Sequence, residues 1–187
     1  MSSRAGYVLV GGGSSRMGHD KALLKYGGGT LVQAVAEAVR QATGNVALVG
    51  SVQLYGHLGY GVLPDIYPGE GPLGGILSVL QNSAAEWTLI VACDMPGLTA
   101  DFLHGLMEAA ERSDGDVLVP VGPGGRLEPL CAVYHRRSRQ GIYKAFEQGV
   151  RKVATALEKV RAVTLAVPEV LPFQNVNTPE EWRRYAR

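Results

Sequence analysis

Short apolar runs alternate with segments of helical period along almost the whole chain. Runs rich in Val, Ile, Leu and aromatic residues predict strands at 7–10, 46–49, 61–63, 87–93, 116–121, 130–135 and 162–167. Apolar residues spaced three and four positions apart predict helices near 31–42, 72–80, 99–110, 138–148 and 153–159. Thr30 and Thr99 stand where the helices after them would need an N-cap residue.

This alternation predicts a Rossmann-like three-layer α/β/α fold in a single domain spanning residues 1–187. The strand at 130–135 follows the strand before it with no helix between them, so we expect a mostly parallel sheet with one antiparallel strand. In open sheets of this kind, ligands bind outside the carboxyl ends of the strands. Polar or glycine-rich segments follow three predicted strands, after Val10, at Asp65 and at Asp94.

The C-terminal segment predicts an extended piece at 173–176 and a helix that begins at Thr178. Thr178, Pro179 and Glu181 fit a capping box, which gives that sequence a local structural explanation. The box does not account for Asn175 and Asn177, which the strand period would place on one face. Two amides there could bind a polar ring or could belong to an ordinary turn.

Composition narrows the class of protein. Lys and Arg number 18 and Asp and Glu number 17, so the net charge of +1 argues against general attraction to nucleic acid or to an anionic membrane. No apolar stretch approaches the ~20 residues of a membrane span. Cys93 and Cys131 form no CxxC pair and suggest buried free thiols, so we expect a cytoplasmic protein. Glycine is in excess, with 25 residues, of which 17 lie in the first 75.

The first glycine cluster follows the first predicted strand and runs from Gly11 to Lys21. Glycines let backbone amides converge on an anion, while Arg16 can bind phosphate oxygens in a fork and Lys21 supplies a point charge. The nucleoside-triphosphatase loop fails because two residues separate Gly18 from Lys21, and the dinucleotide fingerprint fails because Arg16 replaces its last glycine. The alternatives are a polyphosphate loop of another kind and a flexible surface loop with incidental charge.

Two carboxylates stand at the ends of other predicted strands. Asp65 opens a segment with four glycines and three prolines at 64–76, where it could bind the base or sugar of a nucleotide or could cap a rigid turn. Gly74 and Gly75 lie in the next helix, where glycine is unfavourable unless a base or another backbone approaches closely. Asp94 follows the clearest strand; it could hold Mg²⁺ beside phosphates or form a turn before Pro96.

Together these segments resemble the molybdenum cofactor guanylyltransferases. The matching pieces occur in order across nearly the whole chain: Leu9-Val-Gly-Gly-Gly-Ser-Ser-Arg-Met-Gly-His-Asp-Lys-Ala-Leu23, Asp65 with Pro68-Gly-Glu-Gly-Pro-Leu-Gly-Gly-Ile76, Cys93-Asp-Met-Pro96, Glu128-Pro-Leu-Cys-Ala-Val-Tyr134 and Asn175-Val-Asn-Thr-Pro-Glu180. The resemblance implies a nucleotidyltransferase with GTP and molybdopterin as substrates and with dependence on Mg²⁺. Carrier proteins of molybdopterin and molybdoenzyme-maturation proteins would be its partners.

The resemblance also implies roles for individual residues. It assigns Leu9, Val10, Gly11, Gly12 and Lys21 to the phosphates and base of GTP. It assigns Asp65 to the nucleotide, Asp94 to Mg²⁺, and Asn175 and Asn177 to the pterin. The N-terminal half would then bind GTP and the C-terminal half molybdopterin.

The sequence departs from the family pattern at two points. Val10 replaces the usual alanine, and the asparagine that the family has near the end of its second strand is not evident around Val49-Gly50. One nucleotide contact is therefore unassigned.

The expected reaction is attack by the terminal phosphate of molybdopterin on the α-phosphorus of GTP, with pyrophosphate as the leaving group. A phosphate monoester is largely deprotonated at pH 7, so no general base is required. Arg16 and Lys21 would stabilise charge on the phosphates, and Asp94 would hold the metal. The alternatives are a cytidylyltransferase of the same pathway, a sugar-phosphate nucleotidyltransferase and a nucleotide-binding adaptor without activity. The first loop of the cytidylyltransferases typically reads Ala-Ala-Gly and their second segment is rich in serine, so resemblance at Gly11-Gly12 and at Gly71 to Gly75 favours guanine.

Overall fold

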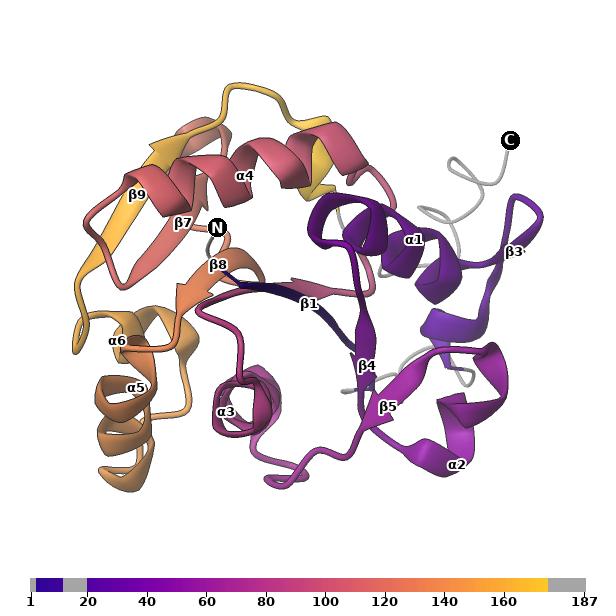
Figure 1. Cartoon of the computed structure of the whole chain (residues 1–187), viewed down its shortest axis with the longest axis horizontal. Coiled ribbons are helices and arrows are strands. Elements are labelled where there is room, and N and C mark those ends of the chain that lie inside the picture. Colours follow the sequence, from indigo (N-terminus) through magenta and orange to yellow (C-terminus); the bar gives the residue numbers. More distant parts are fainter. Residues whose placement is uncertain (1–2, 12–19, 175–187) are drawn as a thin grey trace.

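The computed structural model describes residues 3–11 and 20–174, which form a seven-stranded sheet between two layers of helices (Figure 1). The strands are β1 (Arg4–Leu9), β4 (Ala47–Val49), β5 (Gly61–Leu63), β6 (Trp87–Ala92), β7 (Val117–Val121), β8 (Cys131–His135) and β9 (Ala162–Ala166). Their order across the sheet is β5-β4-β1-β6-β8-β7-β9. Only β8 among them runs antiparallel to its neighbours, so the expected sheet with one reversed strand is confirmed.

The helices divide between the two faces of the sheet. One face is covered by α1 (Leu31–Thr43) and α4 (Ala100–Arg112), and the other by α3 (Gly71–Asn82), α5 (Ser138–Glu147) and α6 (Val153–Leu157), as Figure 1 shows. Each face has its own buried apolar cluster. Val35 and Leu103 lie in the first, and Ile76 and Ile142 lie in the second. The apolar spacing that predicted these helices therefore marks the sides that pack on the sheet.

The structure adds two elements that the sequence did not predict. A short helix, α2 (Val52–Tyr55), follows β4, and a two-stranded hairpin of β2 (Lys25–Tyr26) and β3 (Gly29–Thr30) precedes α1. Gly27 occupies the turn of this hairpin with a φ of 55°, a conformation that side chains other than glycine rarely adopt. The glycine triplet at 27–29 thus closes a hairpin.

One expectation for the C-terminal segment was wrong. Phe173 was predicted to begin an extended piece, but it ends a 3-10 turn, Leu171–Phe173. Its amide donates to the Val170 carbonyl at 3.1 Å, and its ring packs edge-on against Phe102 of α4. Pro172 suits such a turn because its φ is fixed near the helical value. The helix predicted from Thr178 lies outside the described residues.

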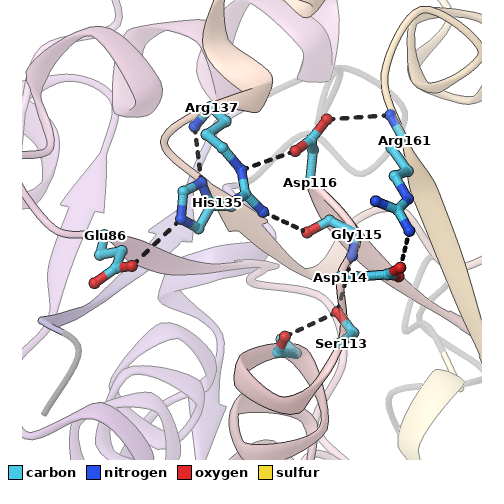
Figure 2. Close-up of polar contacts among 9 residues, drawn as sticks. Glu86, Ser113, Asp114, Gly115, Asp116, His135, Arg137 and Arg161 are labelled. Carbon is cyan, nitrogen blue, oxygen red and sulfur yellow. Dashed lines mark hydrogen bonds and ion pairs between the residues drawn. The ribbon is translucent and has the colours of Figure 1, made fainter.

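Ion pairs and hydrogen bonds join the strands at the edge opposite the carboxyl ends of the parallel strands (Figure 2). Asp116, just before β7, accepts from Arg137 Nε at 3.0 Å and from the Arg161 amide at 3.3 Å. His135, at the end of β8, accepts through Nδ1 from the Arg137 amide at 3.0 Å and pairs through Nε2 with Glu86 at 3.5 Å. These contacts lie at the edge of the sheet opposite to Gly11, Asp65 and Asp94.

Candidate nucleotide site at the carboxyl edge of the sheet

The strand register aligns four positions just beyond the carboxyl ends of β1, β4, β5 and β6. Leu9 pairs with Val49 and with Ala92, and Val49 pairs with Leu63. Two residues after each of these strand-end residues, the chain has left the strand. These positions are Gly11, Ser51, Asp65 and Asp94. Since β5 and β6 are three strand spacings apart, this row extends over about 14 Å.

The row crosses a topological switch point. After β1 the chain proceeds to β4 and β5 on one side, and then returns to place β6 on the other side of β1. Ligands of open α/β sheets bind at such points, because the loops diverge there and leave a crevice. Gly11 and Asp94 follow β1 and β6, the two strands that flank this switch point.

Lys21 and Asp94 meet at the switch point as an ion pair. Lys21 begins a 3-10 turn, Lys21–Leu23, and its Nζ lies 2.7 Å from Asp94 Oδ2. The side chains are 18% and 16% exposed, so the pair is shielded but can be reached from solvent. Residues that are 73 positions apart, and that the sequence assigned to phosphate and to metal, thus lie together.

The second oxygen of Asp94 has no partner within the described part of the chain. Asp94 Oδ1 is buried and makes no hydrogen bond there. A buried acceptor without a donor is unfavourable, and a bound cation would satisfy it. Burial, followed by the charge of Asp94, raises the pKa of the neighbouring Cys93 thiol to about 12, so this thiol stays protonated.

The three strand-end residues predicted to contact GTP differ in what they offer. Gly11 is exposed and has a φ of 85°, so only glycine fits it without strain. Val10 is buried, and its amide already donates to the Val49 carbonyl at 3.0 Å. The Leu9 carbonyl accepts from the Cys93 amide at 3.2 Å. Contacts of Leu9 and Val10 with a nucleotide stay predictions.

Gly50 explains how the sheet accommodates the larger residue at position 10. A Cβ on Gly50 would lie 2.8 Å from the Val10 carbonyl oxygen and 2.9 Å from Val10 Cγ2. The side chain of Val10 therefore occupies space that any side chain at position 50 would need. The two departures from the family pattern adjoin each other in the structure.

Asp65 has a structural role that is visible in its contacts. Its Oδ1 accepts from the Tyr67 amide at 2.9 Å and from the Ser78 hydroxyl at 2.8 Å, so it fixes the turn between β5 and α3. This is the rigid-turn alternative for Asp65. Both hydrogen bonds use Oδ1, and the predicted contact with a nucleotide would use Oδ2.

Gly74 is required by packing within the protein, and Gly75 is closely packed against a side chain. A Cβ on Gly74 would lie 2.8 Å from the Tyr67 carbonyl oxygen, and one on Gly75 would lie 3.2 Å from Leu9 Cδ2. Close approach of another backbone, one of the two reasons anticipated, therefore accounts for Gly74. At Gly75 the approaching group is the side chain of Leu9.

Sequence reasoning missed a hydrogen bond between Tyr55 and Asp20. The Tyr55 hydroxyl donates to Asp20 Oδ2 at 2.5 Å, and Asp20 Oδ1 accepts from the Ala22 amide at 3.0 Å. Burial, with the hydrogen bond to Asp20, raises the pKa of Tyr55 far above its usual value. No local pattern could pair residues 35 positions apart, and the only signal was that Asp20 lies within the glycine-rich segment.

Glu128 lies near the same edge, just before β8. The Ala92 amide donates to the Leu130 carbonyl at 2.8 Å, which joins this segment to the end of β6. The Glu128 carboxylate is buried, and burial raises its pKa although Arg126 Nε lies 2.8 Å away and opposes that shift. A carboxylate is thus held on the C-terminal side of the switch point.

Several predicted site residues lie outside the described residues. They are Gly12, Arg16, Asn175 and Asn177, and their roles stay predictions. Within residues 3–11 and 20–174, no three His, Cys, Asp or Glu side chains are grouped as a metal cage would require. No helix in that part of the chain is long and apolar enough to cross a membrane.

Comparison with known proteins places this chain in a family. The MobA-like NTP transferase domain matches residues 6–161. A probable molybdenum cofactor guanylyltransferase of Bacillus cereus is 32% identical and covers 97% of this chain and 95% of its own length. A protein with the same description from Pelotomaculum thermopropionicum is 35% identical, with 97% and 91% covered.

Solved structures agree with the fold. The molybdopterin-guanine dinucleotide biosynthesis protein A of Archaeoglobus fulgidus superposes with a TM-score of 0.83 at 26% identity, covering 97% of this chain and 96% of the other. A CMP:2-keto-3-deoxy-manno-octonic acid synthetase, solved with CTP, has a TM-score of 0.78 at 15% identity, covering 98% and 96%, and supports the fold alone. This chain belongs to the MobA-like NTP transferase family and is a nucleotidyltransferase.

Proposed function

We propose that the protein transfers GMP from GTP to the terminal phosphate of molybdopterin, which yields the guanine dinucleotide form of the cofactor and pyrophosphate. Relatives described as molybdenum cofactor guanylyltransferases match it over 97% of its length, which supports this reaction. The observation that carries the proposal in the structure is the Lys21–Asp94 pair at the switch point of the sheet.

Lys21 would bind the phosphates of GTP and stabilise the departing pyrophosphate. Its ammonium is a point charge held by a residue on the neighbouring strand end, so little ordering is needed when the nucleotide arrives. Gly11 would let the triphosphate approach the backbone closely. We assign Arg16 to the same phosphates on the basis of the sequence.

The residues present fit a magnesium ion. Asp94 Oδ1 is buried and meets no hydrogen-bond donor among residues 3–11 and 20–174, while Oδ2 is held by Lys21. Mg²⁺ typically uses one or two carboxylates together with phosphate oxygens and water, so a single aspartate at a phosphate site is sufficient. When bound, the ion would neutralise charge on the phosphoryl group in transfer.

The protein needs to align the reactants but does not need to supply a base or a nucleophile. The acceptor phosphate is largely ionised near pH 7. The Cys93 thiol beside Asp94 stays protonated, because its pKa is about 12, and a thiol is a poor nucleophile. We therefore propose direct attack of the acceptor phosphate on the α-phosphorus with no covalent enzyme intermediate.

We assign the nucleoside end of GTP to the side of the row that ends at Asp65. Asp65 Oδ2 is the oxygen proposed to contact the nucleotide, because Oδ1 serves the turn. The C-terminal half would receive molybdopterin, with Asn175 and Asn177 facing the pterin. A cytoplasmic location and partners that carry molybdopterin or mature molybdoenzymes belong to the same proposal.

Release of pyrophosphate is the direct test. We expect release from GTP with Mg²⁺ only when molybdopterin is present, and no release from CTP. Release with CTP but not GTP would identify a cytidylyltransferase, and release with sugar phosphates would identify the other enzyme class. Binding of GTP without turnover on any acceptor would favour an adaptor.

The Asp94→Asn variant tests the metal assignment. The substitution keeps the shape of the side chain but removes the charge that Lys21 and a cation both require. We expect the thermal unfolding curve to remain cooperative and the rate of pyrophosphate release to fall by at least about 100-fold. A wild-type rate in this variant would show that Asp94 does not hold the metal.

A further inference from the structure

The Tyr55 hydroxyl connects the end of β4 to the residue that precedes Lys21. Tyr55 is 1% exposed and ends the short helix α2, where its amide donates to the Ser51 carbonyl at 3.0 Å. Its ring belongs to the apolar cluster shared by α1 and α4. Its hydroxyl reaches Asp20 at 2.5 Å.

Two glycines lie beside this tyrosine. A Cβ on Gly50 would crowd the Tyr55 ring at 3.3 Å, and one on Gly11 would make ordinary contact with the hydroxyl at 3.9 Å. The Tyr55 side chain therefore lies close to the residues that follow β1 and β4. Gly11 and Asp20 are the described residues on either side of 12–19, so the hydroxyl lies near both.

Asp20 transmits this contact to the ion pair. Its Oδ1 accepts from the Ala22 amide at 3.0 Å, and its carbonyl accepts from the Leu23 amide at 3.1 Å, so Asp20 caps the turn in which Lys21 stands. Ala22 is fully buried, so packing also holds the turn in place. From this turn the Lys21 side chain extends to Asp94 Oδ2 at 2.7 Å.

We propose that Tyr55 and Asp20 are positioning residues, which fix the turn at Lys21 so that its ammonium meets Asp94 and, in the proposed reaction, the phosphates of GTP. The effect on catalysis rests on the proposed function; the effect on Lys21 does not. Burial, followed by the hydrogen bond to Asp20, raises the pKa of Tyr55, so its hydroxyl stays protonated as the donor in this contact.

The first test needs no substrate. In protein labelled with ¹⁵N lysine, the Lys21 side-chain ammonium signal is identified by its loss in Lys21→Ala. We expect Tyr55→Phe to shift or broaden this signal, because it removes only the hydroxyl. Tyr134→Phe is the matched control: Tyr134 is fully buried, and its hydroxyl donates to the Pro129 carbonyl at 2.8 Å. An unchanged Lys21 signal in Tyr55→Phe would overturn the proposal.

The second test separates positioning from a general loss of stability. We expect Tyr55→Phe to lower the rate of pyrophosphate release by about tenfold, as the loss of one hydrogen bond to a charged group can do. In the Lys21→Ala background the same substitution should have little further effect, because both changes disturb one group. Equal losses in both backgrounds would mean that Tyr55 does not act through Lys21.

The outcomes also distinguish the two proposals. If wild-type protein releases no pyrophosphate from GTP, the proposed function fails, while the ammonium signal still decides the role of Tyr55. If wild-type protein is active and the Tyr55→Phe loss matches that of Tyr134→Phe, the positioning proposal fails and the proposed function stands.

Discussion

At the scale of single residues, the surroundings of a helical glycine decide whether a side chain could replace it. Gly74 in α3 faces the Tyr67 carbonyl oxygen, whereas Gly105 in α4 has no atom within 4 Å of an added Cβ. Both are helical, so they share the intrinsic disadvantage of glycine in a helix. Only the surroundings differ.

Alanine substitutions at these two glycines should therefore change stability in opposite directions. We expect Gly74→Ala to destabilise the protein by about 1–3 kcal/mol through crowding, and Gly105→Ala to stabilise it by up to about 1 kcal/mol. Urea unfolding followed by circular dichroism measures both. Stabilisation by Gly74→Ala would mean that Tyr67 can move away at little cost.

His135 should make the protein less stable in acid. Burial lowers its pKa first and the charge of Arg137 adds to this, while Glu86 and Asp116 oppose the shift. The unfolded chain therefore takes up the proton more readily, so the free energy of unfolding should fall as the pH drops below about 6.5 and level off below the folded-state pKa. His135→Gln removes this contribution.

Unfolding curves at pH 7.5 and pH 5 measure the effect of His135. The wild type should lose more stability between these values than His135→Gln does. Equal losses would show that His135 does not couple folding to protonation.

The site residues that could be predicted are those with a local signal. Asp94 directly follows an apolar strand, and Lys21 closes a glycine cluster, so each is visible in a short window of sequence. Their meeting at 2.7 Å and the contact of Tyr55 with Asp20 depend on strand order, which no short window contains.

At the scale of elements, the period of apolar residues located every long helix in the described chain, and capping residues marked some of their starts. Thr99 Oγ1 accepts from the Phe102 amide at 3.2 Å, as its place before α4 suggested. The helix α2 escaped prediction because four residues complete little more than one turn and show no period. The hairpin escaped prediction because β2 and β3 have two residues each, too few to show the alternation of a strand.

Loss of the Thr99 cap should weaken α4 by a measurable amount. We expect Thr99→Ala to lower the free energy of unfolding by about 1 kcal/mol and Thr99→Ser to leave it nearly unchanged, because serine keeps the acceptor oxygen. Urea titration gives both values. If serine is as harmful as alanine, the methyl group and not the cap is responsible.

At the scale of the whole molecule, one sheet continues across both halves of the chain. β6 of the first half pairs with β8 of the second, and a single apolar cluster includes Val8 and Phe173. The alternation of strands and helices could predict a layered fold with a reversed strand. It could not predict the strand order, which depends on the side of β1 to which each crossover returns.

This continuity predicts that the protein unfolds as one unit. Urea curves recorded by far-ultraviolet circular dichroism and by tryptophan fluorescence should coincide, because one sheet and one apolar cluster join the two halves of the described chain. Two resolved transitions would show that the halves are separate domains.

Because both cysteines are buried, their reaction with a thiol label measures how often the structure opens around them. Burial raises the pKa of each thiol, and thiolates, not thiols, react with electrophilic labels. The native protein should therefore resist alkylation, and the label should enter only when the chain opens. Cys93 adjoins Asp94, and Cys131 begins β8, where it pairs with Val91, so both thiols lie near the carboxyl edge of the sheet and their alkylation rates measure how often that edge opens.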